Sequence, residues 1–145
     1  VIKNYVNMGI AVDTPEGLIV PNIKNVQEKS ILDIAEAITM LASAAKTRKL
    51  KIPDLKGASF TISSLGAIGG KFFTPIINPP EVGILGLSKT FPKVVSLNNS
   101  FESREFLPLS LSYDHRVING VYAAHFITQL GVALGDTSLM EKKFK

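Results

Sequence analysis

The stretch LSYDHRVING, residues 111–120, is the most informative part of the sequence for both the fold and the chemistry. Its first residues are typical of a strand, and its final glycine precedes a helical pattern that includes Ala124, Ile127 and Leu130. We therefore expect a turn between a strand and a helix, with His115 presented beyond the end of a rigid sheet. Histidine has an unperturbed pKa of about 6.5, so this side chain is suited to proton transfer at neutral pH.

The residues around His115 also have purely structural interpretations. For His115, a hydrogen-bonded residue at a strand end is the alternative to a catalytic base. Asp114 and Arg116 flank it in an extended chain, where successive side chains point to opposite sides, so we expect them to pair with other parts of the structure. Asn119 comes directly before the helix, where asparagine is a favoured N-cap residue. His125 falls within that helix, where we expect it to pack.

A second informative stretch, SFTISSLGAIGG, covers residues 59–70. It places the hydroxyl of Ser63 where a buried strand opens into a glycine-rich turn, and glycines there permit the close approach of a ligand. The alternative is an ordinary serine in a loop. The glycines lack the lysine of a phosphate-binding loop and the spacing of a dinucleotide-binding fingerprint, so neither nucleotide motif is present.

The remaining pattern predicts more strands than helices. A helix is expected from an N-cap at Ser30 into the basic residues 46–51, before Pro53, and a second helix follows Gly120. The expected strands cover residues 6–12, 18–20, 60–62, 82–87, 94–97 and 106–112.

The connections between these elements favour an α+β fold. The first two strands form a hairpin around residues 14–17, and residues 98–100 join the last two. The apolar run at 82–87 is typical of a central strand that is buried on both faces. Because the two helices are separated in the sequence, we expect them to pack on one mixed sheet. Residues 140–145 are a candidate for a disordered tail.

Composition excludes several functional classes. The chain has 145 residues, 46% hydrophobic and 19% charged, which is typical of one globular domain. It has no cysteine, which excludes a disulfide framework, a thiolate nucleophile and a cysteine zinc site. The net charge of +4 gathers at residues 46–51 and 142–145 without interleaved aromatic residues, so we expect solvated helix ends and no nucleic-acid partner. No apolar run approaches the roughly 18 residues of a membrane span, and the start lacks the layout of a signal peptide.

Four segments resemble one enzyme family, the dihydrolipoyl acyltransferases, which are the core subunits of the 2-oxoacid dehydrogenase complexes. DHRVING at 114–120 resembles its DHRxxDG signature, and FTISSLG at 60–66 resembles its FTISxLG segment. PEVGILG at 80–86 is similar to its PEVAILG strand, and GIAVDTPEGLIVP at 9–21 is similar to its GIAVDTPxGLxVP hairpin. The order also agrees, and the likeness covers nearly the whole chain. We expect residues 1–145 to form the larger, C-terminal part of the catalytic domain, without its N-terminal portion.

The resemblance implies a two-layer fold like that of chloramphenicol acetyltransferase, assembled as a homotrimer or a larger core. In that family the active site is a channel between subunits, which coenzyme A and lipoyl-lysine enter from opposite ends. Matched by motif, His115 is the general base and Ser63 is the hydroxyl that stabilises the transition state, and neighbouring subunits contribute them. Asn119 is the third site residue and stands where the signature has aspartate. Because asparagine cannot ionise, helix capping or hydrogen bonding is the role left to it.

The implied reaction is transfer of an acetyl group from S-acetyldihydrolipoyl-lysine to coenzyme A in a pyruvate dehydrogenase complex, since residues 109–115 are most similar to the acetyltransferase branch. The lipoyl-lysine belongs to a separate lipoyl domain, and the other expected partners are the 2-oxoacid dehydrogenase and dihydrolipoamide dehydrogenase components. No metal is expected. The expected location is the bacterial cytoplasm, or the mitochondrial matrix in a eukaryote. Two alternatives are a non-catalytic core subunit and a stand-alone chloramphenicol-type acetyltransferase, although the latter usually has His-His where this chain has Asp-His.

Overall fold

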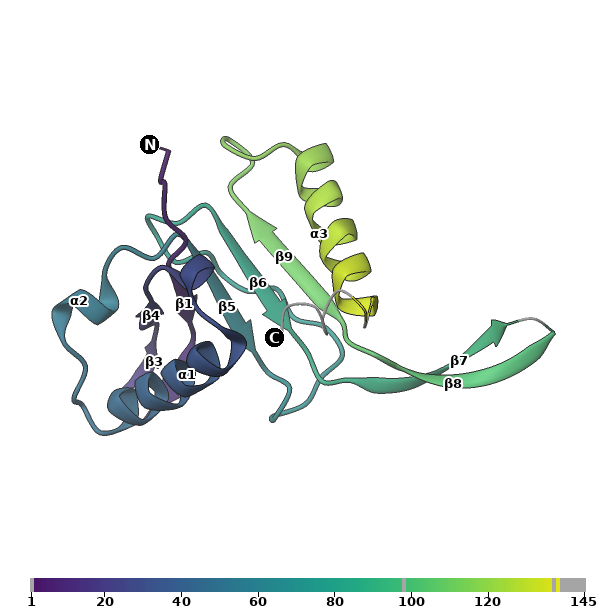
Figure 1. Cartoon of the computed structure of the whole chain (residues 1–145), viewed down its shortest axis with the longest axis horizontal. Coiled ribbons are helices and arrows are strands. Elements are labelled where there is room, and N and C mark those ends of the chain that lie inside the picture. Colours follow the sequence, from purple (N-terminus) through teal and green to yellow (C-terminus); the bar gives the residue numbers. More distant parts are fainter. Residues whose placement is uncertain (1, 98, 137, 139–145) are drawn as a thin grey trace.

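In the computed structural model, the described residues form a five-stranded sheet, two separate hairpins and two long helices (Figure 1). The structure describes residues 2–97, 99–136 and 138, so the predicted disordered tail at 140–145 lies outside the described residues. The five strands, in their order across the sheet, are β4 (Asn22–Ile23), β1 (Met8–Ile10), β5 (Phe60–Ser64), β6 (Gly83–Leu87) and β9 (Leu109–Tyr113).

The sheet is mixed. β5 runs parallel to β1 on one side and to β6 on the other, whereas the two edge strands β4 and β9 run antiparallel to their neighbours. β6 lies inside the sheet, and four of its five residues are buried, as the apolar run predicted. The α+β class with a mixed sheet is therefore confirmed.

The other elements are connections and additions to this sheet. The hairpin of β7 and β8 projects away from the main sheet (Figure 1). These elements are the hairpin strands β2 (Val12–Thr14) and β3 (Gly17–Ile19), the hairpin strands β7 (Phe91–Leu97) and β8 (Ser100–Phe106), the 3₁₀ helix η1 (Val26–Glu28), and the helices α1 (Ile31–Lys46), α2 (Ile52–Leu55) and α3 (Gly120–Gly135).

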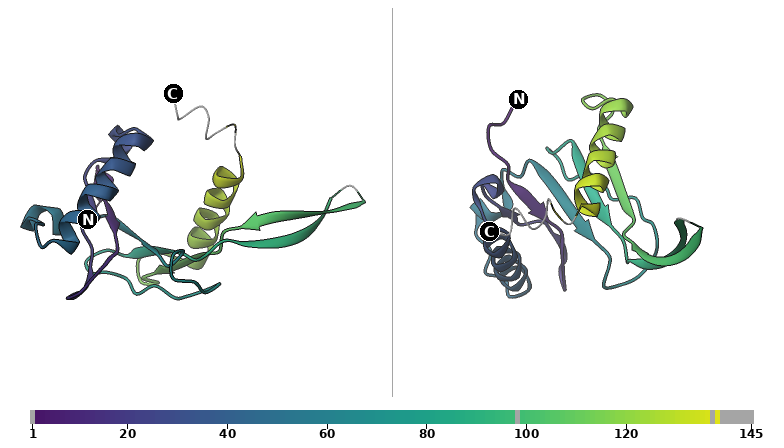
Figure 2. Two further views of the ribbon diagram at one scale, coloured as in Figure 1. Left: turned by 90° about the horizontal axis from the view of Figure 1, so that it is seen from below. Right: turned by 45° about the vertical axis from the view of Figure 1, so that its right-hand side comes forward.

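The two long helices lie on the same side of the sheet, as Figure 2 shows in its left view. α3 packs on β5 through the rings of Phe60 and Phe126, whose centroids are 5.9 Å apart. α1 begins at the predicted N-cap: the Ser30 hydroxyl accepts a hydrogen bond from the backbone N–H of Asp33, and the Asp33 carboxylate accepts one from the backbone N–H of Ser30. α1 ends in the basic stretch, as predicted. Among the described residues, no helix is both long and apolar enough to cross a membrane.

Three strand predictions need correction. The strand expected at 6–12 is two strands, β1 and β2, with a break at Ala11, although the hairpin around residues 14–17 is confirmed. The strand expected at 106–112 is present as β9, but it begins at Leu109, and Phe106 belongs to the end of β8. Pro108, which has no backbone N–H to donate to a ladder, lies in the gap. β8 itself was not predicted, because its sequence is polar and all seven of its residues are exposed.

Candidate active site

His115 lies in the turn that follows β9, as predicted, and its side chain is exposed. The backbone N–H groups of Val117 and Ile118 both donate to the carbonyl oxygen of Asp114, at 3.0 and 2.9 Å, and these bonds close the turn. The N–H of Asp114 donates to the carbonyl oxygen of Val82 at 2.9 Å, which ties the turn to the start of β6. The turn that carries the imidazole is therefore anchored to the end of β6, an inner strand of the sheet.

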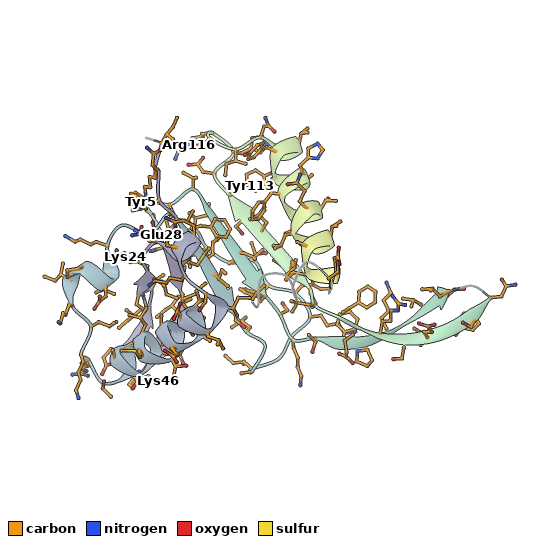
Figure 3. All side chains as sticks on the ribbon, in the orientation of Figure 1. Tyr5, Lys24, Glu28, Lys46, Tyr113 and Arg116 are labelled. Carbon is orange, nitrogen blue, oxygen red and sulfur yellow. The ribbon has the colours of Figure 1, made fainter. Side chains whose placement is uncertain are left out.

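Asp114 and Arg116 brace this turn by pairing with each other. Arg116, which is labelled in Figure 3, donates from Nη2 to Oδ2 of Asp114 at 2.6 Å. Its backbone N and its Nε each donate to Oδ1 of Asp114 at 3.0 Å. These bonds lower the pKa of Asp114 to about 2. The bonds from the guanidinium contribute most, and the bond from the backbone N–H contributes less. The prediction that both residues pair elsewhere is wrong. Residues i and i+2 lie on the same side of an extended chain, and the turn after Asp114 brings these two side chains within hydrogen-bonding distance.

Tyr113 and the start of α3 border the imidazole. The ring centroids of Tyr113 and His115 are 5.6 Å apart, with an interplanar angle of 38°. A Cβ atom placed on Gly120 would lie 3.6 Å from Oη of Tyr113 and 3.9 Å from Nε2 of His115. Asn119 caps α3, because its side-chain oxygen accepts a hydrogen bond of 2.8 Å from the backbone N–H of Tyr122. The capping interpretation of Asn119 is confirmed, and the asparagine thereby fixes the turn at its second end.

Ser63 lies on β5, where it pairs with Gly86 of β6. Because successive strand residues point to opposite faces, and Phe60 faces α3, Ser63 faces the side of the sheet away from that helix. There it lines a cavity of about 350 Å³ between the sheet, the chain around Leu18 and Val20, and residues 75–78. Among the described residues that line this cavity, all are apolar except Ser63 and Asn78.

Ser63 and His115 do not meet within one chain. Ser63 is level with Gly86, and Gly86 is level with Ser110 of β9. Tyr113, the last residue of that strand, is three residues after Ser110, and His115 lies two residues beyond Tyr113. At roughly 3.3 Å per residue, the two positions are separated by at least about 10 Å along the strand direction.

α3 is less covered than the sequence suggested. His125 is exposed, so the prediction that it packs within the chain is wrong. Three apolar side chains of α3 are also about two-thirds exposed: Val121 at 69%, Tyr122 at 70% and Val132 at 64%. An apolar side of this helix is thus available for contact with another chain.

Asn78 and Glu81 were not among the predicted site residues. Glu81 is buried, and its carboxylate accepts hydrogen bonds from the Thr61 hydroxyl at 2.7 Å and from the Asn78 amide at 3.1 Å. The sequence feature that could have drawn attention to them is the acidic Glu81, directly before the most apolar predicted strand. Within the part of the chain that the structure describes, no three histidine, cysteine, aspartate or glutamate residues gather as metal ligands do.

Comparison with known proteins identifies one family. The model of the 2-oxoacid dehydrogenases acyltransferase catalytic domain matches residues 1–141. The acetyltransferase component of the pyruvate dehydrogenase complex of Azotobacter vinelandii is 55% identical over 134 residues, which are 92% of this chain and 21% of that protein. The corresponding component of Bacillus subtilis is 42% identical over 138 residues, 95% of this chain and 31% of that protein.

Solved structures agree with these sequence matches. A structure of the Azotobacter vinelandii dihydrolipoamide acetyltransferase, from work on the role of a serine, a histidine and an asparagine in its catalytic mechanism, aligns with a TM-score of 0.91 and 53% identity. The match covers 94% of this chain and 56% of that one. The cubic core of a pyruvate dehydrogenase multienzyme complex aligns with a TM-score of 0.90 and 55% identity, over 93% of this chain and 56% of that one. The chain therefore spans just over half of these solved chains, and about a fifth of the Azotobacter protein.

Proposed function

The chain belongs to the family of 2-oxoacid dehydrogenase acyltransferases, and on that basis we propose that it transfers an acetyl group from S-acetyldihydrolipoyl-lysine to coenzyme A. The main support for this proposal is the sequence spacing of three residues. In the Azotobacter enzyme, the serine, histidine and asparagine whose catalytic role was investigated are separated by the same numbers of residues as Ser63, His115 and Asn119. We therefore assign these three residues to the active site.

His115 acts as the general base. A thiol with a pKa near 8.5 is mostly protonated at pH 7, so removing its proton speeds attack. His115 takes the proton of the coenzyme A thiol, and the sulfur attacks the carbonyl carbon of the acetyl thioester. The exposed position of the imidazole beyond β9 leaves it accessible to such a substrate.

Ser63 stabilises the negative charge that develops on the thioester oxygen by donating its hydroxyl hydrogen. When the tetrahedral intermediate collapses, the bond to the dihydrolipoyl sulfur breaks and this sulfur receives the proton from His115. The acetyl group leaves on coenzyme A, and no bond to the enzyme is formed. Asn119 contributes by capping α3 and holding the turn that carries His115.

We place the complete site between two chains of a homotrimer. The separation of Ser63 and His115 within one chain supports this arrangement, since a hydroxyl and a base must both reach one thioester. The exposed apolar side chains of α3 supply a surface that a neighbouring chain could cover. The similarity to a cubic core supports assembly beyond a monomer.

The wider setting is a pyruvate dehydrogenase complex, because the most similar relatives carry that name. We propose a lipoyl domain as the acetyl donor, and the pyruvate dehydrogenase and dihydrolipoamide dehydrogenase components as further partners. The relatives are bacterial, which supports a cytoplasmic location. Asparagine at position 119 does not favour the non-catalytic alternative, because the Azotobacter enzyme has asparagine at the same interval.

The test is acetyl transfer from S-acetyldihydrolipoamide to coenzyme A by the full-length protein. We expect the His115→Ala variant to lose about 100- to 10,000-fold in rate, and the Ser63→Ala variant about 100- to 1,000-fold. Ser64→Ala, a change at the exposed next residue of the same strand, is the matched control and should retain activity. Undiminished transfer by His115→Ala would remove the histidine from its role. A folded wild-type protein without transfer activity would favour the non-catalytic core subunit.

A further inference from the structure

Asn78 is the second polar side chain in the Ser63 cavity, and neither the reaction nor the capping of α3 accounts for it. The other described lining residues, among them Leu18, Val20 and Ile84, are apolar. Binding sites of this kind use a few polar groups to fix the orientation of an otherwise apolar ligand. Ser63 is already assigned to the thioester oxygen, so Asn78 is available for a second polar group of the same ligand.

A buried carboxylate fixes the orientation of the Asn78 amide. Glu81 is 7% exposed, and its Oε1 accepts from Nδ2 of Asn78 at 3.1 Å. Its Oε2 accepts from the hydroxyl of Thr61 at 2.7 Å, and Thr61 is fully buried. An ionised carboxylate can only accept hydrogen bonds, so the nitrogen of the asparagine amide must face Glu81 and the oxygen must face away.

This arrangement leaves two groups of Asn78 free to bind a ligand. Among the described residues, the hydrogen bond to Glu81 is the one that the Asn78 side chain makes, which leaves Oδ1 and the second N–H of Nδ2 for a ligand. One acceptor and one donor side by side match the N–H and C=O of another amide. Thr61 also shares a face of β5 with Ser63, two residues away, so the same strand holds both polar groups of the cavity in place.

We propose that Asn78 binds the amide that joins the lipoyl chain to its lysine, and that Glu81 positions Asn78 for this contact. This inference rests on the proposed function. The lipoyl chain is apolar between its thioester and its amide, which suits the apolar residues that line the cavity together with Ser63 and Asn78. The phosphates of coenzyme A require cations, and none of the described lining residues is a lysine or an arginine. The cavity therefore does not hold the nucleotide end of coenzyme A, and the KM values for the two substrates, measured below, separate the lipoyl amide from the amides of the pantetheine arm.

The decisive comparison is between two acetyl donors that differ only at this amide. S-acetyldihydrolipoamide carries the amide, whereas S-acetyldihydrolipoate carries a carboxylate, which cannot donate to Asn78 and is repelled by Glu81. Dissociation constants would be measured by calorimetry on the full-length wild-type protein and on its Asn78→Ala variant. The wild-type protein should bind the amide donor about 10-fold more tightly than the carboxylate donor, and Asn78→Ala should lose most of this preference.

Glu81→Gln tests the positioning role with the shape of the side chain retained. A glutamine can donate as well as accept, so it allows the Asn78 amide to turn over and present the wrong groups. We expect the KM for the amide donor to rise several-fold and the KM for coenzyme A to stay unchanged. Asn4→Ala, which removes an exposed asparagine outside the cavity, is the control.

Two results would overturn the inference: an Asn78→Ala variant that keeps the wild-type preference for the amide donor, or variants in which the KM values of both substrates rise together. The second result would show that Asn78 and Glu81 only support the structure. Failure of the proposed function gives a different result. In that case the wild-type protein would bind the amide donor but would not transfer its acetyl group to coenzyme A, so the binding site would be present without the reaction.

Discussion

Ser63 and His115 lie near opposite ends of the five-stranded sheet. The pairing of β5 with β6, and of β6 with β9, places Ser63 level with Ser110, whereas His115 follows the far end of β9. The turn that holds His115 is fixed by its own backbone bonds, by a backbone bond to Val82 directly before β6, and by the cap of α3. A local movement of the turn would therefore not close this gap. A shared site requires the serine of one chain and the histidine of another.

This geometry predicts that two inactive variants restore each other. Ser63→Ala and His115→Ala should each be nearly inactive alone. When the two full-length variants are co-expressed and mix at random, about one site in four should combine an intact serine with an intact histidine from the adjacent chain. Acetyl transfer should therefore return to about a quarter of the wild-type rate. If each chain forms its own complete site, no mixture contains an intact pair and the activity stays at the level of the single variants.

The Asp114–Arg116 pair predicts a pH dependence of stability. The pairing lowers the pKa of Asp114 to about 2 in the folded protein, below the usual value of about 3.9. A carboxyl group with a lowered folded-state pKa stabilises the fold fully above its unfolded pKa, and this contribution is lost as the pH falls through the folded value. Asp114→Asn should therefore lower the melting temperature at pH 7, and the difference from wild type should shrink between about pH 4 and pH 2. A difference that stays constant over this range would show that the charge of Asp114 is not its cause.

Asn119 offers a test of capping against charge. Asn119→Ala removes the acceptor for the N–H of Tyr122 and should destabilise the protein by about 0.5–2 kcal/mol. Asn119→Asp keeps this acceptor, so its stability in thermal denaturation should be close to that of wild type. If the role of Asn119 is to hold the turn, the aspartate variant also retains acetyl transfer. Loss of activity in a stable Asn119→Asp variant would instead require the neutral amide itself in the reaction.

The helix caps and the central strand were predictable because their causes are local. The side chains of Ser30 and Asn119 each accept a hydrogen bond from the backbone N–H three residues ahead. The continuous apolar run at 82–87 is typical of a strand inside a sheet, where both of its faces are buried. The position of His115 followed from the same reasoning, since a strand and a helix meet at its turn. Its assignment as a base came from the family motif and stays a prediction, as does that of Ser63.

What the sequence could not predict depends on contacts between distant segments. β8 is exposed along its whole length and five of its seven residues are polar, so only its pairing with β7 makes it a strand. Asn78 acquires its place only when β5, with Thr61 and Ser63, comes alongside the chain before β6. Neither residue spacing nor composition contains that information.

Gly9 provides a test of the packing beneath the cavity. A Cβ atom on Gly9 would collide with Oγ1 of Thr61 and would lie 3.1 Å from Cγ1 of Val20, a residue of the cavity wall. Because Thr61 is fully buried and bonded to Glu81, it cannot move aside easily. Gly9→Ala should therefore cost about 1–3 kcal/mol of unfolding free energy, measured by denaturant titration of the full-length protein.

The Gly9→Ala substitution should be less costly when Thr61 is already alanine, since the colliding oxygen is then absent. A double-mutant cycle between Gly9→Ala and Thr61→Ala should accordingly give a favourable coupling of about 0.5–3 kcal/mol. Thr61→Ala alone removes the hydrogen bond to Glu81, so its own cost must be measured separately. Additive effects of the two substitutions would mean that the strain of a Cβ at Gly9 is relieved elsewhere, and that β1 and β5 are not held in register by this close contact.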